Sequence, residues 1–131
     1  MSPKKWTTRP ANRGWAIGRR KVSQQYVEIA HLIEIEEGLA INVCVGLCVL
    51  AGIAAGDAIC AASTGLRYSG QDHSAAADFL ATVDDKAGGH LRTLVALKPG
   101  AHYGNELLTA RDRKVALRAA DALVELAISK T

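Results

Sequence analysis

The sequence has little proline, few aromatic residues and few cysteines. Only 3 of its 131 residues are proline, and aromatic residues make up 5% of the chain. Alanine, leucine, valine and isoleucine supply most of the 49% that is hydrophobic. This composition favours helices, and a chain of this length can form one domain with a buried core.

All three cysteines, Cys44, Cys48 and Cys60, lie within the longest apolar run. An odd number of cysteines without a framework spacing is a poor basis for disulfides, and it favours a reducing compartment such as the cytoplasm. Free cysteine is among the most buried residue types, so we interpret all three as small core residues. We predict no metal site and no cofactor.

Several motifs of common enzymes are missing from the sequence. It contains no glycine-rich phosphate loop, Walker lysine, C-x-x-C or H-E-x-x-H motif, and no serine in a nucleophile-elbow context. The N-terminus lacks the apolar segment of a secretory signal. The apolar run over residues 43–56 is shorter than the ~20 residues that span a membrane, and Asp57 then interrupts it. We therefore expect a cytoplasmic protein without a membrane segment.

The charge distribution is asymmetric although the formal net charge is only +3. No acidic residue precedes Glu28. The basic residues of this first part are Lys4, Lys5, Arg9, Arg13, Arg19, Arg20 and Lys21. We predict a basic, partly disordered leader over residues 1–18 and a single helical domain over residues 19–131. This basic arm can bind nucleic-acid phosphates, or it can lie on its own domain or on a partner subunit.

Two tryptophans, Trp6 and Trp15, lie in the predicted leader. Disordered tails rarely carry tryptophan, because such segments contain few aromatic residues. Either side chain can anchor the arm on the domain or stack on a nucleic-acid base. We favour anchoring.

The longest apolar run predicts a central helix over residues 39–64. It is apolar on nearly all sides, which is typical of a helix surrounded by others. Gly46, Gly52 and Gly56 each lower helix propensity by about 1 kcal/mol. We therefore expect a neighbouring helix, of this chain or of a second subunit, to approach closely there. Asp57 requires a hydrogen-bond or charge partner in this apolar setting.

Four further helices are predicted around the central one. They span about residues 19–37, 72–84, 86–97 and 109–129. Gly65 is expected to end the central helix in the left-handed conformation, and Pro99 to end the fourth helix. Thr109 and Asp112 approximate a capping box at the start of the last helix. Short connections then predict an all-α, up-and-down bundle of about five helices without a confident strand.

A first candidate site is the polar loop RYSGQDH, from Arg67 to His73. A ribonuclease that cuts by attack of the 2′-hydroxyl needs a general acid or base, which histidine supplies. It also needs a cation for the charge that develops on phosphate, which arginine supplies. The structural alternative is that Asp72 and His73 cap the third helix and that Arg67 is exposed to solvent.

A second polar group, Lys98, His102 and Tyr103, precedes the last helix. A lysine, an imidazole and a phenol together can hold a phosphate or a base edge. Alternatively, Tyr103 packs under the loop while its hydroxyl bonds to backbone. With Asp57 and Asp72, these three residues are the candidate ligand-binding residues.

The order of these features resembles the HEPN domains (higher eukaryotes and prokaryotes nucleotide-binding), especially small bacterial members. The resemblance rests on a long helix with AGIAAGDAIC, then Gly65, a polar loop ending in Asp72 and His73, AAADFL, and LKPGAHYG before an alanine-rich helix. It covers about residues 22–128. The resemblance implies an up-and-down helical bundle that commonly forms homodimers.

Some HEPN proteins are metal-independent ribonucleases with an Arg-x(4–6)-His motif, while others are non-catalytic partners of nucleotidyltransferases or bind nucleotides. Arg67 and His73 fit the ribonuclease spacing. However, Tyr68 stands where those enzymes usually have a polar residue, and Lys98 replaces the arginine that usually precedes the last helix. The resemblance therefore implies a non-catalytic, homodimeric module that binds nucleotide or RNA. A HEPN-type ribonuclease using Arg67 and His73 is the alternative.

Overall fold

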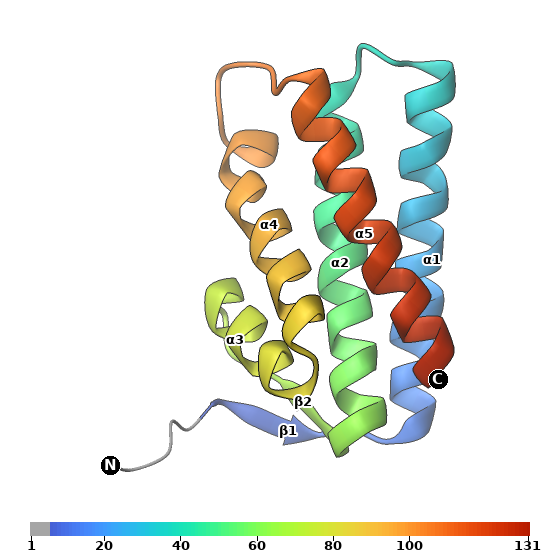
Figure 1. Cartoon of the computed structure of the whole chain (residues 1–131), viewed down its shortest axis with the longest axis vertical. Helices are drawn as coiled ribbons and strands as arrows, with labels where there is room; N and C mark the ends of the chain where they lie inside the picture. The colour runs from blue at the N-terminus through green and yellow to red at the C-terminus, as the bar shows by residue number, and fades with distance from the viewer. Residues whose placement is uncertain (1–5) are drawn as a thin grey trace.

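The protein is a bundle of helices crossed at one end by a small sheet (Figure 1). The computed structural model describes residues 6–131. Its elements are β1 (Thr8–Pro10), α1 (Arg13–Glu36), α2 (Ile41–Thr64), β2 (Leu66–Tyr68), α3 (His73–Val83), α4 (Asp85–His102) and α5 (Ala110–Lys130). The predicted all-α bundle of about five helices is confirmed.

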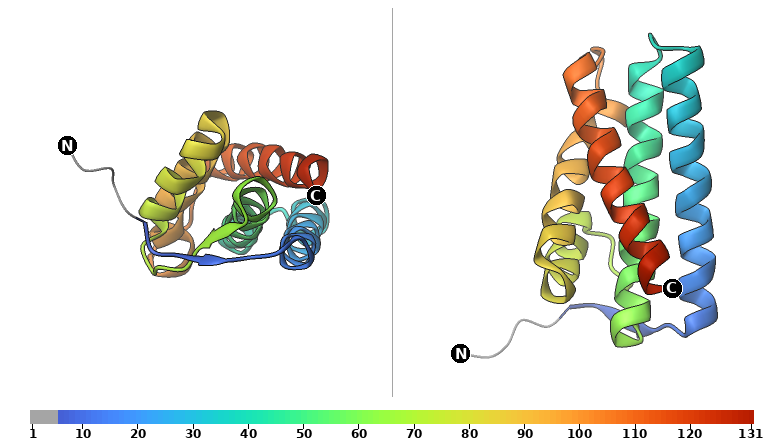
Figure 2. Two further views of the ribbon diagram at one scale, coloured as in Figure 1. Left: turned by 90° about the horizontal axis from the view of Figure 1, so that it is seen from below. Right: turned by 45° about the vertical axis from the view of Figure 1, so that its right-hand side comes forward.

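Helix α2 lies at the centre of the bundle, and α1, α4 and α5 pack around it (Figure 2). Its side chains Val45, Val49 and Ile59 are fully buried. The three cysteines are buried and unpaired, as predicted. Burial raises the pKa of the Cys60 thiol to about 12, because the charged thiolate is poorly solvated there. These thiols are therefore packing residues rather than nucleophiles.

Helix α2 also passes a length and hydropathy test for a membrane-spanning segment. The bundle itself buries 72% of the most apolar window of this helix. Core helices of soluble proteins pass the same test. The length and composition of α2 are therefore weak support for a membrane span.

The glycines of α2 allow side chains of this same chain to approach closely. A Cβ atom at Gly52 would overlap the Leu94 side chain, and one at Gly46 would lie 3.0 Å from His102 Cε1. At Gly56, a Cβ atom would lie 3.2 Å from Leu80 Cδ2. The close approach predicted at these glycines is thus made by α3 and α4.

Three helix ends follow the sequence signals. Gly65 has a φ of 73° and ends α2 in the left-handed conformation. The Asp72 carboxylate accepts a hydrogen bond of 2.9 Å from the backbone N–H of Ser74, so Asp72 caps α3. Thr109 and Asp112 form both hydrogen bonds of a capping box at the start of α5. These local predictions are confirmed because each depends on residues only a few positions apart.

The prediction that Pro99 ends the fourth helix is wrong, since α4 continues to His102. Proline removes one backbone N–H, but its own carbonyl still accepts a hydrogen bond of 2.9 Å from the Tyr103 N–H. The last turn is also supported from α2, where the Asn42 amide donates to the Gly100 carbonyl at 3.4 Å. Tertiary contacts thus maintain a turn that local propensity disfavours.

The described part of the predicted, partly disordered leader contains β1 and the first residues of α1. Helix α1 begins at Arg13 rather than at Arg19, and the Asn12 side chain caps it by accepting a 2.8 Å hydrogen bond from Trp15 N–H. Before the helix, β1 pairs antiparallel with β2. Neither strand was predicted, because neither shows the alternation of apolar and polar residues that is typical of strands. Strands of three residues are too short to show a period of two. Residues 1–5 of the predicted leader lie outside the described part of the chain.

Candidate functional site

The partner that Asp57 requires is Arg19. Arg19 of α1 reaches Asp57 of α2 through two nitrogens, Nη2 at 3.1 Å and Nε at 3.2 Å from Oδ2. Burial raises the pKa of the Asp57 carboxyl, while the positive charges of Arg19 and Arg67 oppose that rise. One basic residue of the predicted arm is therefore used inside the protein to balance the aspartate of the central helix.

Both tryptophans of the predicted leader lie against the domain. The Trp6 ring is 5.6 Å from the Phe79 ring, measured between centroids. The Trp15 ring has the guanidinium carbons of Arg67 and Arg19 at 5.3 Å and 6.0 Å from its centroid. Both tryptophan side chains are therefore anchored on the domain.

The two residues of the predicted ribonuclease motif lie in different surroundings. Arg67 is on β2 and contacts Trp15, whereas His73 is the first residue of α3. The pKa of His73 is lowered, first by burial and then by the positive charge of Lys98, while Asp72 opposes the change. Lys98 of the second predicted group is thus close enough to His73 to affect its pKa.

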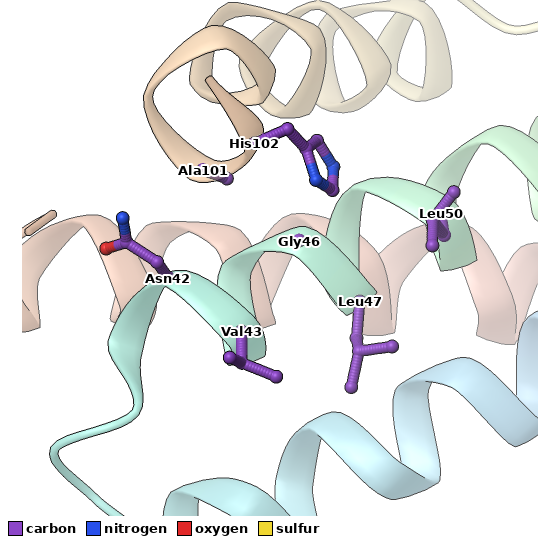
Figure 3. Close-up of a pocket in the computed structure, with 7 residues that line it drawn as sticks. All are labelled: Asn42, Val43, Gly46, Leu47, Leu50, Ala101 and His102. Atoms are coloured by element: carbon purple, nitrogen blue, oxygen red, sulfur yellow. The ribbon is translucent and has the colours of Figure 1, made fainter. Parts of the chain in front are cut away.

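His102 and Tyr103 lie at the C-terminal end of α4, where His102 forms part of a pocket (Figure 3). The imidazole extends across Gly46 towards Leu50. The cavity measures about 330 Å³ and is lined by Asn42, Val43, Gly46, Leu47, Leu50, Ala101 and His102. Tyr103 is 78% exposed, so the alternative that it packs under the loop is wrong. The residues that follow Tyr103, from Gly104 to Leu107, are themselves exposed and do not cover its ring.

The basic residues predicted to form an arm are distributed over several elements. Arg20 donates hydrogen bonds to Gln24 and Thr131 at 3.1 and 3.0 Å, and Arg13 donates to the Thr131 carbonyl at 3.3 Å. Arg9 and Lys21 are exposed. Lys4 and Lys5 lie outside the described residues. The described basic residues of the predicted arm are therefore held by β1 and α1.

The sequence reasoning missed an exposed apolar surface at the end of the bundle opposite the sheet. The α1–α2 and α4–α5 loops meet at this end (Figure 1). Its exposed residues are Ile35 (76%), Leu39 (87%), Val43 (57%), Tyr103 (78%) and Leu107 (76%). We call these five residues the apolar end. The signal in the sequence was a pair of large apolar residues, Ile35 and Leu39, on either side of Gly38 at the end of the first predicted helix.

The described residues thus combine exposed basic side chains, such as Arg9 of β1 and Lys21 of α1, with the apolar end. Within residues 6–131, no group of three or more His, Cys, Asp or Glu side chains is placed to hold a metal ion. No protein-family model matches the sequence, and no curated protein matches it either.

Proposed function

We propose that the protein is a non-catalytic, homodimeric HEPN-like module that binds a nucleotide or RNA. The observation that carries this proposal is the apolar end, where large side chains from α1, α2 and the two loops beside them are 57–87% exposed. Contiguous exposed apolar surfaces on soluble proteins mark interaction sites. Burying them against a partner removes this surface from water and stabilises an assembly.

A second copy of the chain is the partner that we propose for the apolar end. A two-fold axis places the same patch on both subunits, so an apolar patch meets an apolar patch. The pocket beside it has an apolar wall of Val43, Leu47 and Leu50 that suits a side chain from the other copy. A nucleotidyltransferase, the partner implied by the HEPN resemblance, would compete for this surface.

The nucleotide-binding part of the proposal is supported by exposed cations, including Arg9 and Lys21. The non-catalytic part is supported by the separate surroundings of Arg67 and His73. General acid–base catalysis with phosphate stabilisation requires both groups to reach one phosphate. Arg67 instead contacts Trp15, and Lys98 and Asp72 influence His73.

Size measurement by sedimentation or light scattering tests the homodimer. We expect the parent to be a dimer and the Leu39→Glu/Val43→Glu variant to be a monomer, since each buried apolar side chain contributes about 1.5–3 kcal/mol. Ile128→Glu, at a 46% exposed residue near the end of α5, is the control and should remain a dimer. A monomeric parent, or a dimer in all three proteins, would contradict the proposal.

The ribonuclease alternative keeps one supporting observation. The lowered pKa of His73 favours the neutral imidazole, which is the form that a general base requires. We expect no RNA cleavage by the purified parent. Cleavage that is lost in both His73→Ala and Arg67→Ala would replace the non-catalytic proposal with this alternative.

A further inference from the structure

The sheet end of the bundle places two arginines directly opposite each other. Arg9 of β1 and Arg67 of β2 are partners in the antiparallel register. Directly opposite residues project from the same face of a sheet, with Cβ atoms about 4.5–5.5 Å apart. Like charges at this spacing destabilise strand pairing. The sheet therefore forms despite an unfavourable cross-strand pair.

A third arginine lies close to this pair. The guanidinium groups of Arg67 and Arg19 both lie beside the Trp15 ring, at 5.3 and 6.0 Å from its centroid. Cation–π attraction holds each of them against the indole. Trp15 thus limits the motion of two long, positively charged side chains.

The nearby negative charge does not balance these cations. Asp57 interacts electrostatically with Arg19 and Arg67, but its hydrogen bonds come from Arg19 Nε and Nη2. Within residues 6–131, the guanidinium groups of Arg9 and Arg67 donate no hydrogen bond to protein atoms. Arg9 is exposed and Arg67 is partly exposed, so a ligand can reach both.

We propose that Arg9 and Arg67 bind a phosphate group at the sheet end of the bundle. Planar guanidinium groups match phosphate oxygens in charge and geometry, and an anion between them relieves their mutual repulsion. Trp15 positions Arg67 for this contact. The inference rests on the proposed function, because the phosphate is that of a nucleotide or of the RNA backbone.

The test compares two doubly substituted variants with equal loss of charge. Arg9→Gln/Arg67→Gln removes the proposed contacts, and Arg111→Gln/Arg118→Gln removes two exposed arginines of α5. Binding of a fluorescent single-stranded oligouridylate is measured by anisotropy between 50 and 200 mM salt. Each lost phosphate contact lowers the salt slope of log K by about 0.7. Because the two arginines share one phosphate, we expect a reduction of about 0.7 for the sheet variant and little change for the α5 variant.

A second measurement distinguishes the source of the phosphate. In a Trp6→Phe background, Trp15 fluorescence reports binding of ATP or inorganic phosphate. If ATP or phosphate changes the Trp15 fluorescence and Arg9→Gln/Arg67→Gln abolishes that change, the site binds a single phosphate group. If RNA binds but ATP and phosphate leave the fluorescence unchanged, the site recognises the RNA backbone. Thermal unfolding of each variant verifies that it is folded.

Distinct outcomes overturn the inference and the proposed function. If the parent binds RNA and the salt slopes of the two double variants are equal, the site is overturned while nucleotide or RNA binding stands. If a dimeric parent binds neither RNA, ATP nor phosphate, the phosphate site and the ligand-binding part of the proposed function are both overturned. The homodimer then remains as a separate result.

Discussion

At the scale of single residues, Asp57 shows how one charged group is accommodated in the core helix. Its side chain is 22% exposed, and Arg19 is its hydrogen-bonded partner. Burial disfavours the carboxylate more than Arg19 and Arg67 favour it, so the pKa of the folded protein is above the ordinary value of 3.8. The folded state therefore binds this proton more tightly than the unfolded state does.

This pKa shift predicts a specific pH dependence of stability. Between pH 3.8 and the raised pKa, the folded protein holds more protons on Asp57, so its free energy of unfolding falls as the pH rises. Asp57→Asn should lack this component. We expect the stability of the parent to fall relative to that of Asp57→Asn from about pH 4 upward and then to level off.

Urea unfolding between pH 4 and pH 7 measures this difference. Glu125→Gln, on the exposed face of α5, is the control for removing an acidic side chain. An increase in the parent's relative stability with pH would show that the ion pair, rather than burial, dominates at Asp57.

The sequence predicted that Asp57 needed a partner, but it did not identify that partner. An acid inside an apolar helix indicates that a hydrogen-bond or charge partner is needed. Arg19 is 38 positions away, and the sequence analysis assigned it to the basic arm. The same limit applies to Arg67 and His73. Their spacing suggested a common site, but the spacing in a loop does not determine the direction of two side chains.

At the scale of elements, the contact between α3 and α4 depends on one glycine. A Cβ atom at Gly88 would lie 2.6 Å from the Ala81 Cα and 2.9 Å from its backbone nitrogen. Backbone atoms cannot move aside as a flexible side chain can. At the adjacent Gly89, no heavy atom lies within 4 Å of such a Cβ atom.

Gly88→Ala and Gly89→Ala should therefore have opposite effects on stability. We expect Gly88→Ala to lower the free energy of unfolding by about 1–3 kcal/mol, because the two helices must separate. Gly89→Ala should raise it by about 0.5–1 kcal/mol through better helix propensity. Chemical denaturation of both variants measures the difference, and equal effects would refute the close contact at Gly88.

The elements predicted best are those whose ends depend on local chemistry. Gly65, Asp72 and the Thr109 capping box all depend on residues within one turn. The turn after Pro99 was missed because Asn42, from a distant part of the chain, supports it. The strands were missed because their pairing, rather than their own sequence, defines them.

At the scale of the whole molecule, the N-terminal segment ties the two sides of the bundle together. β1 crosses beneath α2, and Trp6 packs on Phe79 of α3 (Figure 2). The predicted fold class and the central position of α2 required only composition and periodicity. The path of this segment also required knowledge of what its aromatic residues contact.

Removing the Trp6 side chain should weaken the whole bundle. We expect Trp6→Ala to lower the free energy of unfolding by about 1.5–3 kcal/mol, the range for burying a large apolar side chain. Lys114→Ala, at an exposed residue of α5 outside the apolar end, is the control and should change stability by less than about 0.5 kcal/mol. Urea unfolding measures both, and a Trp6 variant as stable as its control would rule out this anchoring role.

The pairing of β1 with β2 also affects the order in which the chain can fold during synthesis. β1 is translated first, but its partners Leu66–Tyr68 emerge only after α1 and α2 have been made. At about 5–20 residues per second, the ribosome needs several seconds to deliver them. The first described strand must therefore wait unpaired, and it can close onto β2 only after α1 and α2 have been synthesised.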